Sequence, residues 1–278
     1  MDKKYPRRLL CVAIILLLGI GIGIFFIVNS KAEPILIESP NDVFDEESFQ
    51  DVSAADRLAI IDESELATDG ISDSEQDLDE QGSAAASHID GFIALNQSPE
   101  LATGCEITSL TALLNYYSFG ADKCDLADNY LDKGPVGTTD PRVAFVGNPR
   151  DGSSFGCYAP VIVTTANSYL LAQGSAKRAE DISGTSFSDL FSYINAGTPV
   201  IVWGTRYCEV GYYSVTWEVS GGSFTWFTPE HCMVLVGYDT SSNLVSVADP
   251  LVGAIVSYDR DVFESRYNDL NQQAVIIQ

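Results

Sequence analysis

Residues 102–110 read ATGCEITSL, and this short segment decides how the chain is interpreted. Apolar side chains recur at helical spacing after Cys105, which predicts a helix over residues 105–117 that begins directly behind Gly104. The N-terminus of a helix carries unpaired N–H groups and about half a positive charge, and it favours the thiolate form of a cysteine. The position of Cys105 is therefore typical of a nucleophile.

The histidines of the chain narrow the choice of a base. The sequence contains only two of them. His88 lies in a polar stretch rich in serine and alanine, ahead of the predicted globular part. His231 begins an apolar run that predicts a buried strand. His231 is therefore the one imidazole that the predicted globular part offers to a catalytic cysteine.

Asp249 is the candidate partner of His231. Residues 231–248 predict a β-hairpin in which two apolar strands flank a polar turn. If this hairpin is symmetric about Ser241, Met233 lies opposite Asp249. Side chains alternate between the two faces of a strand, so His231 then shares a face with Asp249, whereas a register one residue different would separate them. The alternative is that Asp249 is only a strand-end residue that caps a turn.

Several short motifs occur in the order found in one known family. They are QSPEL at residues 97–101, GCE at 104–106, TSL at 108–110, FVGNP at 145–149, GCYAP at 156–160, PVIVW at 199–203, VGYD at 236–239 and DP at 249–250. With His231 they resemble the C-39-like peptidase domains, relatives of the proteases that trim double-glycine leaders from bacteriocin precursors. The resemblance covers about residues 91–278. It implies a papain-like cysteine peptidase fold.

The resemblance implies a role for each of five residues. Cys105 would attack a carbonyl to form a thioester, and His231 would take the thiol proton and return one to the leaving amine. Asp249 would orient the imidazole, and the Gln97 amide with the backbone N–H of Cys105 would donate to the oxyanion. Tyr158, in the GCYAP motif, is the preferred substrate contact. Gln97 lies eight residues before Cys105, so a solvent-exposed loop residue is the alternative for it.

The order of the predicted elements gives an α+β fold. Helices are expected over residues 105–117, 126–131, 160–171, 187–195 and 260–267, and strands over 200–204, 213–219, 223–227, 231–238, 244–248, 254–258 and 274–277. Residues 134–156 predict a long irregular loop. An N-terminal helical half packed on a C-terminal antiparallel sheet would place the nucleophile and the base on opposite sides of a cleft.

Residues 1–32 predict a membrane anchor or signal segment. Four basic residues precede the mostly apolar stretch Leu9–Val28, whose twenty residues would span about 30 Å as a helix, the hydrocarbon thickness of a bilayer. The basic flank favours a cytoplasmic N-terminus. We therefore expect a single-pass protein of the cell membrane, held in the lipid bilayer through Leu9–Val28, with an extracytoplasmic catalytic domain. Cleavage near residues 30–32 would instead give a secreted protein.

Residues 33–90 form an acidic region between this segment and the predicted peptidase domain, residues 91–278. They hold 18 acidic residues and one basic residue, a net charge of −17 out of −24 for the chain. Such a composition predicts a disordered linker, and an inhibitory pro-region is the main alternative. The predicted domain has 20 acidic and 9 basic residues and no basic patch, which argues against a nucleic-acid partner.

The remaining cysteines carry no metal-binding pattern. Cys11 lies in the apolar segment, and four further residues permit disulfides in an exported domain or are buried free thiols, namely Cys124, Cys157, Cys208 and Cys232. No Cys-x-x-Cys pair occurs, and the only histidine of the predicted domain already has a role. We therefore expect neither a metal site nor a cofactor.

These patterns predict an enzyme that acts on a peptide or protein substrate. The expected function is hydrolysis of peptide or amide bonds by a membrane-tethered or exported thiol peptidase with a Cys-His-Asp triad. An acyl transferase or transpeptidase would use the same residues with an amine in place of water. A binding domain that keeps the fold without turnover is the third possibility.

Overall fold

The computed structural model describes residues 85–278, and the expectations that fall on residues 1–84 lie outside the described residues. The helical elements are α2 (Cys105–Tyr116), α3 (Lys123–Asp125), the π-helical turn η4 (Leu126–Tyr130), α4 (Ala159–Ala172), α5 (Leu190–Asn195), the 3₁₀ turn η5 (Arg206–Cys208) and α6 (Arg260–Asp269). The strands are β1 (Ala86–His88), β2 (Lys133–Gly134), β3 (Phe145–Val146), β4 (Ala179–Asp181), β5 (Val200–Thr205), β6 (Tyr212–Val219), β7 (Gly222–Thr228), β8 (Glu230–Asp239), β9 (Leu244–Asp249), β10 (Ala254–Asp259) and β11 (Ala274–Ile277).

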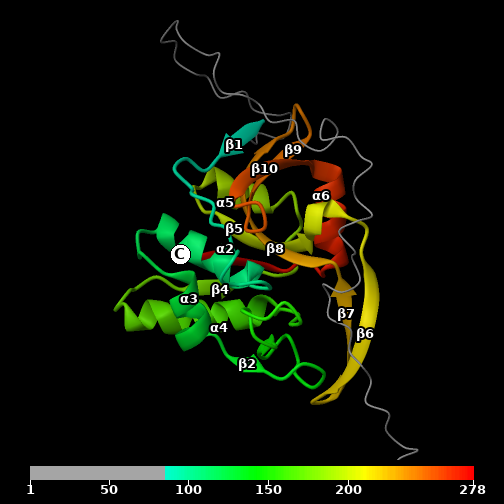
Figure 1. Ribbon diagram of the computed structural model, residues 1–278. Helices are drawn as coiled ribbons and strands as arrows, with labels where there is room; N and C mark the ends of the chain where they lie inside the picture. Colours follow the sequence, from blue (N-terminus) through cyan, green and yellow to red (C-terminus); the bar gives the residue numbers. More distant parts are fainter. Residues whose placement is uncertain (1–84) are drawn as a thin grey trace, which may run out of the picture. The chain divides into compact units, whose positions relative to one another are not determined.

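One antiparallel sheet of seven strands forms the centre of the described domain (Figure 1). Its strands run in the order β10-β9-β8-β5-β11-β4, and β1 also pairs with β8. β5 pairs with residues 230–235 of β8 and β1 with residues 237–239, so β1 continues the edge of β8 where β5 ends. Every residue of β5 and β11 is buried. Burial on both faces explains why these strands are continuous apolar runs in the sequence.

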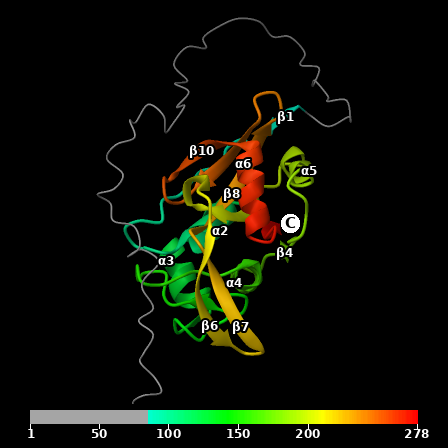
Figure 2. The same ribbon diagram turned by 90° about the vertical axis from the view of Figure 1, so that its right-hand side faces the viewer.

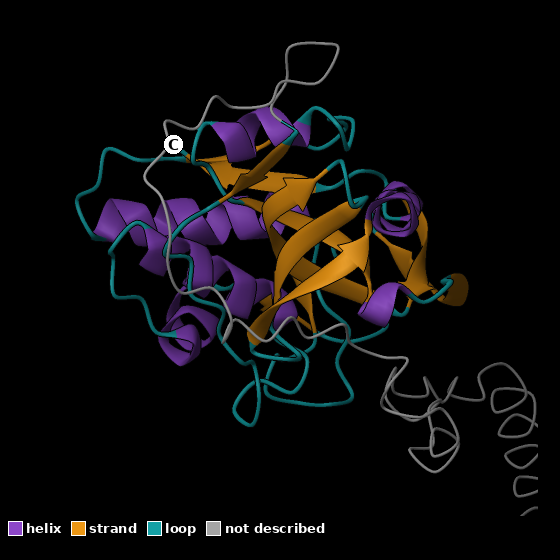
Figure 3. Cartoon of the chain, turned by 90° about the horizontal axis from the view of Figure 1, so that it is seen from above, coloured by secondary structure: helices purple, strands orange, loops and turns teal. Residues whose placement is uncertain are grey.

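Helices cover both faces of this sheet (Figure 3). α2 packs against β8, α4 against β4 and β11, and α6 against β5. Ten of the twelve residues of α2, Cys105–Leu114, are buried. A helix that is buried almost all round is an internal element, so its first residue is held firmly at the wall of the core.

β6 and β7 form a separate hairpin that extends beyond the main sheet (Figures 1 and 2). Its turn contains Gly221 and Gly222 with φ of 94° and 150°, angles that glycine adopts without strain. Trp217 and Trp226 of this hairpin are buried against Phe155. The hairpin is therefore anchored on the long loop that precedes α4.

The register of β8 and β9 decides whether His231 and Asp249 share a face. Next to the turn, Asp239 pairs with Leu244, so the hairpin is centred just after Ser241 and not on it, as the sequence suggested. If this register continued along both strands, His231 and Asp249 would lie on opposite faces of the sheet.

A β-bulge at Val236 corrects this register. The pairing of β8 with β9 shifts by one residue there. Continued beyond the bulge, the new register places Met233 opposite Asp249, and His231 shares the face of Asp249. The carbonyl oxygen of Val236 accepts a hydrogen bond from the Ile89 N–H at 2.7 Å. The hydrogen bond from Ile89, the residue that follows β1, therefore stabilises the bulge.

The α+β architecture is confirmed, and most expected elements lie within two residues of their predicted bounds, except that α5 begins at Leu190. The short strands β1 and β4 were not expected, and the predicted loop over 134–156 contains β3. β1 pairs with β8 and Ile89 is buried, so residues 86–89, which lie before the predicted boundary at residue 91, pack against the sheet. Within residues 85–278, no helix is both long and apolar enough to cross a bilayer.

Candidate active site

Cys105 is the first residue of α2, where the sequence predicted a helix to begin. Gly104 precedes it because a Cβ there would lie 2.5 Å from the Cβ of Leu101. This close approach packs the preceding loop against the start of the helix. The first-turn N–H groups of a helix have no intrahelical acceptor, so the backbone N–H of Cys105 is a candidate donor to a bound ligand.

His231 and Asp249 form a buried pair. Nε2 of His231 lies 2.8 Å from Oδ1 of Asp249, and the two residues are 1% and 0% exposed. Asp249 also accepts hydrogen bonds from the Leu251 N–H at 2.8 Å and the Tyr258 hydroxyl at 3.3 Å. Burial alone would raise the pKa of Asp249, but His231 and these donors outweigh it and hold the pKa below its ordinary value.

A cavity of about 100 Å³ brings the candidate residues together. Its wall includes Cys105 from α2, His231 from β8 and Gln97 from the loop before α2. Glu230, Arg206, Trp226 and Leu251 also line it. The thiol and the imidazole thus belong to one wall of one cavity, between the helical half and the sheet half of the domain.

Gln97 is 2% exposed, so it is not the solvent-exposed loop residue that was the alternative for it. Its backbone N–H donates to the carbonyl oxygen of Pro250 at 2.9 Å, which ties the loop of Gln97 to the end of the β9 segment. Its side-chain amide donates to the Ala102 carbonyl at 3.0 Å, while its Oε1 is buried without a partner. A primary amide has two N–H donors, so one remains for a ligand in the cavity.

Tyr158, the expected substrate contact, lies behind the cavity wall. It is 7% exposed and stacks on Trp226 at a ring distance of 5.6 Å and an angle of 6°. Trp226 lines the cavity and Tyr158 does not. The tyrosine therefore supports the wall, and Trp226 is the aromatic side chain that meets the space beside Cys105.

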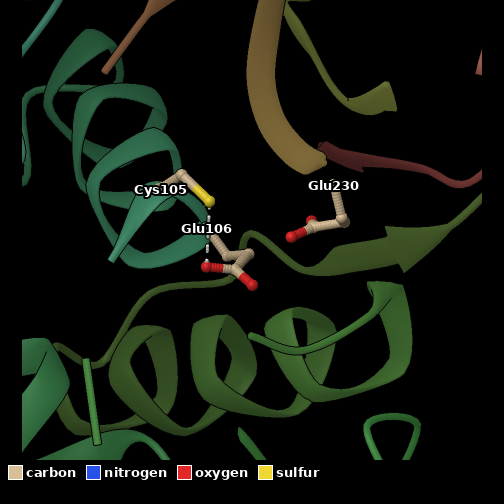
Figure 4. A group of neighbouring side chains, drawn as sticks. All are labelled: Cys105, Glu106 and Glu230. Atoms are coloured by element: carbon tan, nitrogen blue, oxygen red, sulfur yellow. Dashed lines mark hydrogen bonds between the residues drawn. The ribbon is translucent and has the colours of Figure 1, made fainter. Parts of the chain in front are cut away.

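Two acidic residues beside the thiol were missed by the sequence analysis: Glu106 of α2 and Glu230 of β8 (Figure 4). Glu106 is 0% exposed, and its Oε2 lies 3.3 Å from the sulfur of Cys105. Burial raises the pKa of Glu106 to about 7. Burial and then the neighbouring Glu106 also raise the pKa of Glu230. The available signal was their place in the sequence, since Glu106 follows Cys105 directly and Glu230 directly precedes His231.

The resting form of Cys105 differs from the expectation. A helix start was expected to favour the thiolate. However, burial, followed by the charges of Glu106 and Glu230, raises the pKa of the Cys105 thiol well above its ordinary value. The neutral thiol is therefore the resting form, and a partner must take its proton before it can act as a nucleophile.

The ligand atoms of Cys105, Glu106 and Glu230 lie within 4.8 Å of one another, the one such grouping among residues 85–278. A metal ion needs deprotonated ligand atoms with free lone pairs directed at it. Here Oε1 of Glu106 accepts the Cys157 N–H, Oε2 lies against the Cys105 sulfur, and burial keeps that thiol protonated. We interpret the grouping as a carboxyl pair beside a thiol. The five cysteines of the described region are all free.

A cysteine at a helix start and a buried histidine–aspartate pair, facing one cavity of an α+β domain, are the parts of a papain-like cysteine peptidase site. Comparison with known proteins agrees with this class. The chain belongs to the Peptidase_C39 like family, whose model matches residues 89–275.

The chain is also similar to individual known proteins. The chain is 30% identical over 218 residues to the uncharacterized protein YvpB of Bacillus subtilis, covering 76% of this chain and 82% of that protein. The crystal structure of a proposed C39-like peptidase from Bacillus anthracis matches with a TM-score of 0.62 and 30% identity, over 69% of this chain and 97% of the other. Xylellain, a cysteine protease from Xylella fastidiosa, is a distant match at 12% identity and a TM-score of 0.37, covering 70% and 85% of the two chains.

Proposed function

We propose that this protein hydrolyses peptide or amide bonds through a covalent thioester on Cys105. The observation that carries the proposal is the buried contact of 2.8 Å between His231 and Asp249 on the cavity that Cys105 also lines. Elsewhere in a protein, a buried imidazole–carboxylate pair can serve only to stabilise the fold. Beside a thiol at a helix start, it supplies a base with a fixed orientation.

The contacts of His231 assign its two ring nitrogens. An ionised carboxylate only accepts hydrogen bonds, so Nε2, which lies on Asp249, carries the proton. Nδ1 is then the nitrogen that takes the proton of the Cys105 thiol as the sulfur attacks the substrate carbonyl. The same nitrogen returns this proton to the leaving amine. It then takes a proton from the water molecule that attacks the thioester and gives it to the departing sulfur.

The oxyanion of each tetrahedral intermediate needs donors on the cavity wall. The backbone N–H of Cys105 and the second amide N–H of Gln97 are the candidates, since both residues line the cavity. A pair of such donors stabilises the developing charge, and one of them is typically worth about 10²–10³ in turnover. Tyr158 would act indirectly, by holding Trp226 in place against the substrate.

The test is turnover and thiol labelling by the full-length chain. Cys105→Ala should abolish both the cleavage of a mixed peptide library and the labelling of this position by a thiol-directed electrophile. Cys124→Ala, which removes a partly exposed thiol, is the matched control and should keep activity. Cleavage by Cys105→Ala within tenfold of wild type would refute the proposal. Products capped by an added amine, in place of free acids, would instead identify an acyl transferase.

We further propose that the domain acts outside the cytoplasm, tethered through Leu9–Val28. Support comes from the sequence alone, namely the basic flank and the length of the apolar stretch. Protease added to intact cells should digest the domain, which should also sediment with membranes. Recovery of the full-length protein in the cytosolic fraction would overturn this localisation.

A further inference from the structure

Glu106 holds a position that packing alone does not require. Its Oε1 accepts the Cys157 N–H at 2.6 Å and its Oε2 lies 3.3 Å from the sulfur of Cys105. Because Oε1 faces an N–H donor, it must stay an acceptor. A proton on Glu106 therefore sits on Oε2, and the resulting O–H is directed at the sulfur.

Glu230 approaches the same place from the sheet half of the domain (Figure 4). Its Oε1 is buried without a hydrogen-bond partner. Gly156 makes room for both carboxyl groups, since a Cβ there would lie 2.3 Å from Oε1 of Glu106 and 3.3 Å from Oε2 of Glu230. Two carboxyl groups this close in a buried site do not both ionise readily, so the pair retains a proton.

The surroundings of the pair provide little neutralising charge. The titratable and charged groups around it are Cys105 of α2, Cys157 and Tyr158 just before α4, Cys232 of β8 and Arg206 of η5. Arg206 is the only cation among them, and its charge acts on Glu230. The three thiols and the phenol are neutral in their resting forms, because burial raises the pKa of each.

We propose that Glu106 is a positioning residue for the nucleophile, and that its protonated form, favoured by burial beside Glu230, donates a hydrogen bond to the Cys105 thiolate. This step rests on the proposed function, and no proton is gained or lost in it. The thiol proton passes to Nδ1 of His231, and the proton of Glu106 stays on Oε2. The sulfur, now a thiolate, accepts a hydrogen bond from the Glu106 O–H. Deprotonated Glu106 can only accept the S–H, and its charge opposes formation of the thiolate.

The proposal makes the reactivity of Cys105 depend on pH in an unusual direction. A free thiol becomes more reactive as pH rises, because more thiolate forms. Here the donor beside the sulfur is lost as pH rises through the pKa of Glu106, about 7. Glu106→Gln keeps an acceptor for Cys157 and an N–H donor for the sulfur at every pH, so it imitates the protonated residue.

The experiment measures alkylation of Cys105 by iodoacetamide from pH 5 to 9 in the full-length protein, by mass spectrometry of the peptide that contains Cys105. The rates of Glu106→Gln and wild type should agree within about threefold at pH 5.5, and Glu106→Gln should be about tenfold faster at pH 8.5, a thiolate stabilisation of about 1.4 kcal/mol. Glu106→Ala should be slower than Glu106→Gln throughout. Glu180→Gln, at an exposed position on β4, is the matched control and should follow wild type.

A rate ratio of Glu106→Gln to wild type that is the same at every pH would overturn the proposal, as would a folded Glu106→Gln that is unreactive at every pH. If Glu106→Gln does not fold, the wild-type profile decides. Its alkylation rate should rise less steeply with pH above about 7 than below it, and a rate that rises without a break up to pH 9 would overturn the proposal. Alkylation does not require turnover, so a protein that shows this profile yet cleaves no peptide would refute the peptidase function and leave the role of Glu106 intact.

Discussion

Two buried carboxyl groups flank the candidate catalytic residues of this protein, and their pKa values are shifted in opposite directions. Asp249 receives the imidazole of His231, a backbone N–H and a hydroxyl, and its pKa is lowered. Glu106 receives one backbone N–H and a thiol and faces a second acid, and its pKa is raised to about 7. Burial is similar for both. The number and kind of donors therefore decide which carboxyl carries charge.

This difference divides the work between the two halves of the domain. On the sheet half, a charged carboxylate is suited to stabilise the imidazolium that forms when His231 takes a proton. On the helical half, a neutral acid is suited to donate to the thiolate. Variants at these positions test this division of charge.

His231→Ala should reduce turnover by about 10⁴-fold or more, nearly as much as loss of the thiol, because residues 85–278 contain no other histidine than His88, which lies in β1. The measurement is kcat/KM on a cleaved peptide, with melting temperature as the control for folding. Activity within a hundredfold of wild type would show that another group serves as the base.

Asp249→Asn should lose about 10–100-fold less activity than His231→Ala. An amide oxygen can still accept the Nε2–H, but it carries no charge to stabilise the imidazolium. The double variant should be barely worse than His231→Ala alone, because residues that act as a unit are not additive. Multiplicative losses in the double variant would mean that Asp249 only caps the strand end.

The contrast also marks what the sequence can predict. The helix start, the hairpin and the chain order of Cys105, His231 and Asp249 follow from local patterns, because apolar periodicity and turn residues act over short distances. The bulge at Val236 could not be read from the sequence, since the apolar run there is buried on both faces and carries no alternation. Because of the bulge, Met233 lies opposite Asp249 as predicted, although the turn is centred just after Ser241 and not on it.

The carboxyl pair illustrates a second limit. Glu106 and Glu230 are 124 residues apart in the sequence and meet only through packing of α2 on β8. Acidic residues are usually exposed, so nothing in their local sequence indicates burial. Likewise, β1 is three residues long and polar, and its pairing with β8 depends on a strand edge that another part of the chain provides.

The next prediction concerns the support of the sheet half. A chain that begins at residue 85 should melt cooperatively and keep its activity within about twofold, because it retains β1 and the contact of Ile89 with Val236. A chain that begins at residue 91 loses the buried Ile89 and its hydrogen bond, and should be less stable by about 2–4 kcal/mol.

Urea unfolding and peptide cleavage by the two shortened chains provide the measurement. Equal stability of both chains would show that β1 does not support the bulge. A sharp rise in activity for both would instead show that the segment before residue 85 is inhibitory, the alternative to a spacer.

The pH dependence of the free energy of unfolding tests the opposite pKa shifts of Asp249 and Glu106 directly. The pKa of Glu106 is raised in the folded protein, from an ordinary value of 4.5 to about 7. The folded state therefore binds this proton more tightly than the unfolded state. The resulting stability is present in full below about pH 4.5 and is lost as pH rises through 7. Asp249 has the opposite sign, since its lowered pKa gives stability that is present above its ordinary pKa and is lost as the pH falls.

Glu106→Gln cannot titrate, so its free energy of unfolding relative to wild type should rise by on the order of 1–3 kcal/mol between pH 4.5 and pH 8. Urea unfolding of the full-length protein at the two pH values measures this difference, and Glu180→Gln should show none.

Asp249→Asn should change in the other direction, losing stability relative to wild type as pH rises from 3 to 6, because only the wild type then gains its paired charge. If both variants followed wild type in parallel across this range, the two carboxyls would titrate like exposed acids. The division of charge between the two halves would then be wrong.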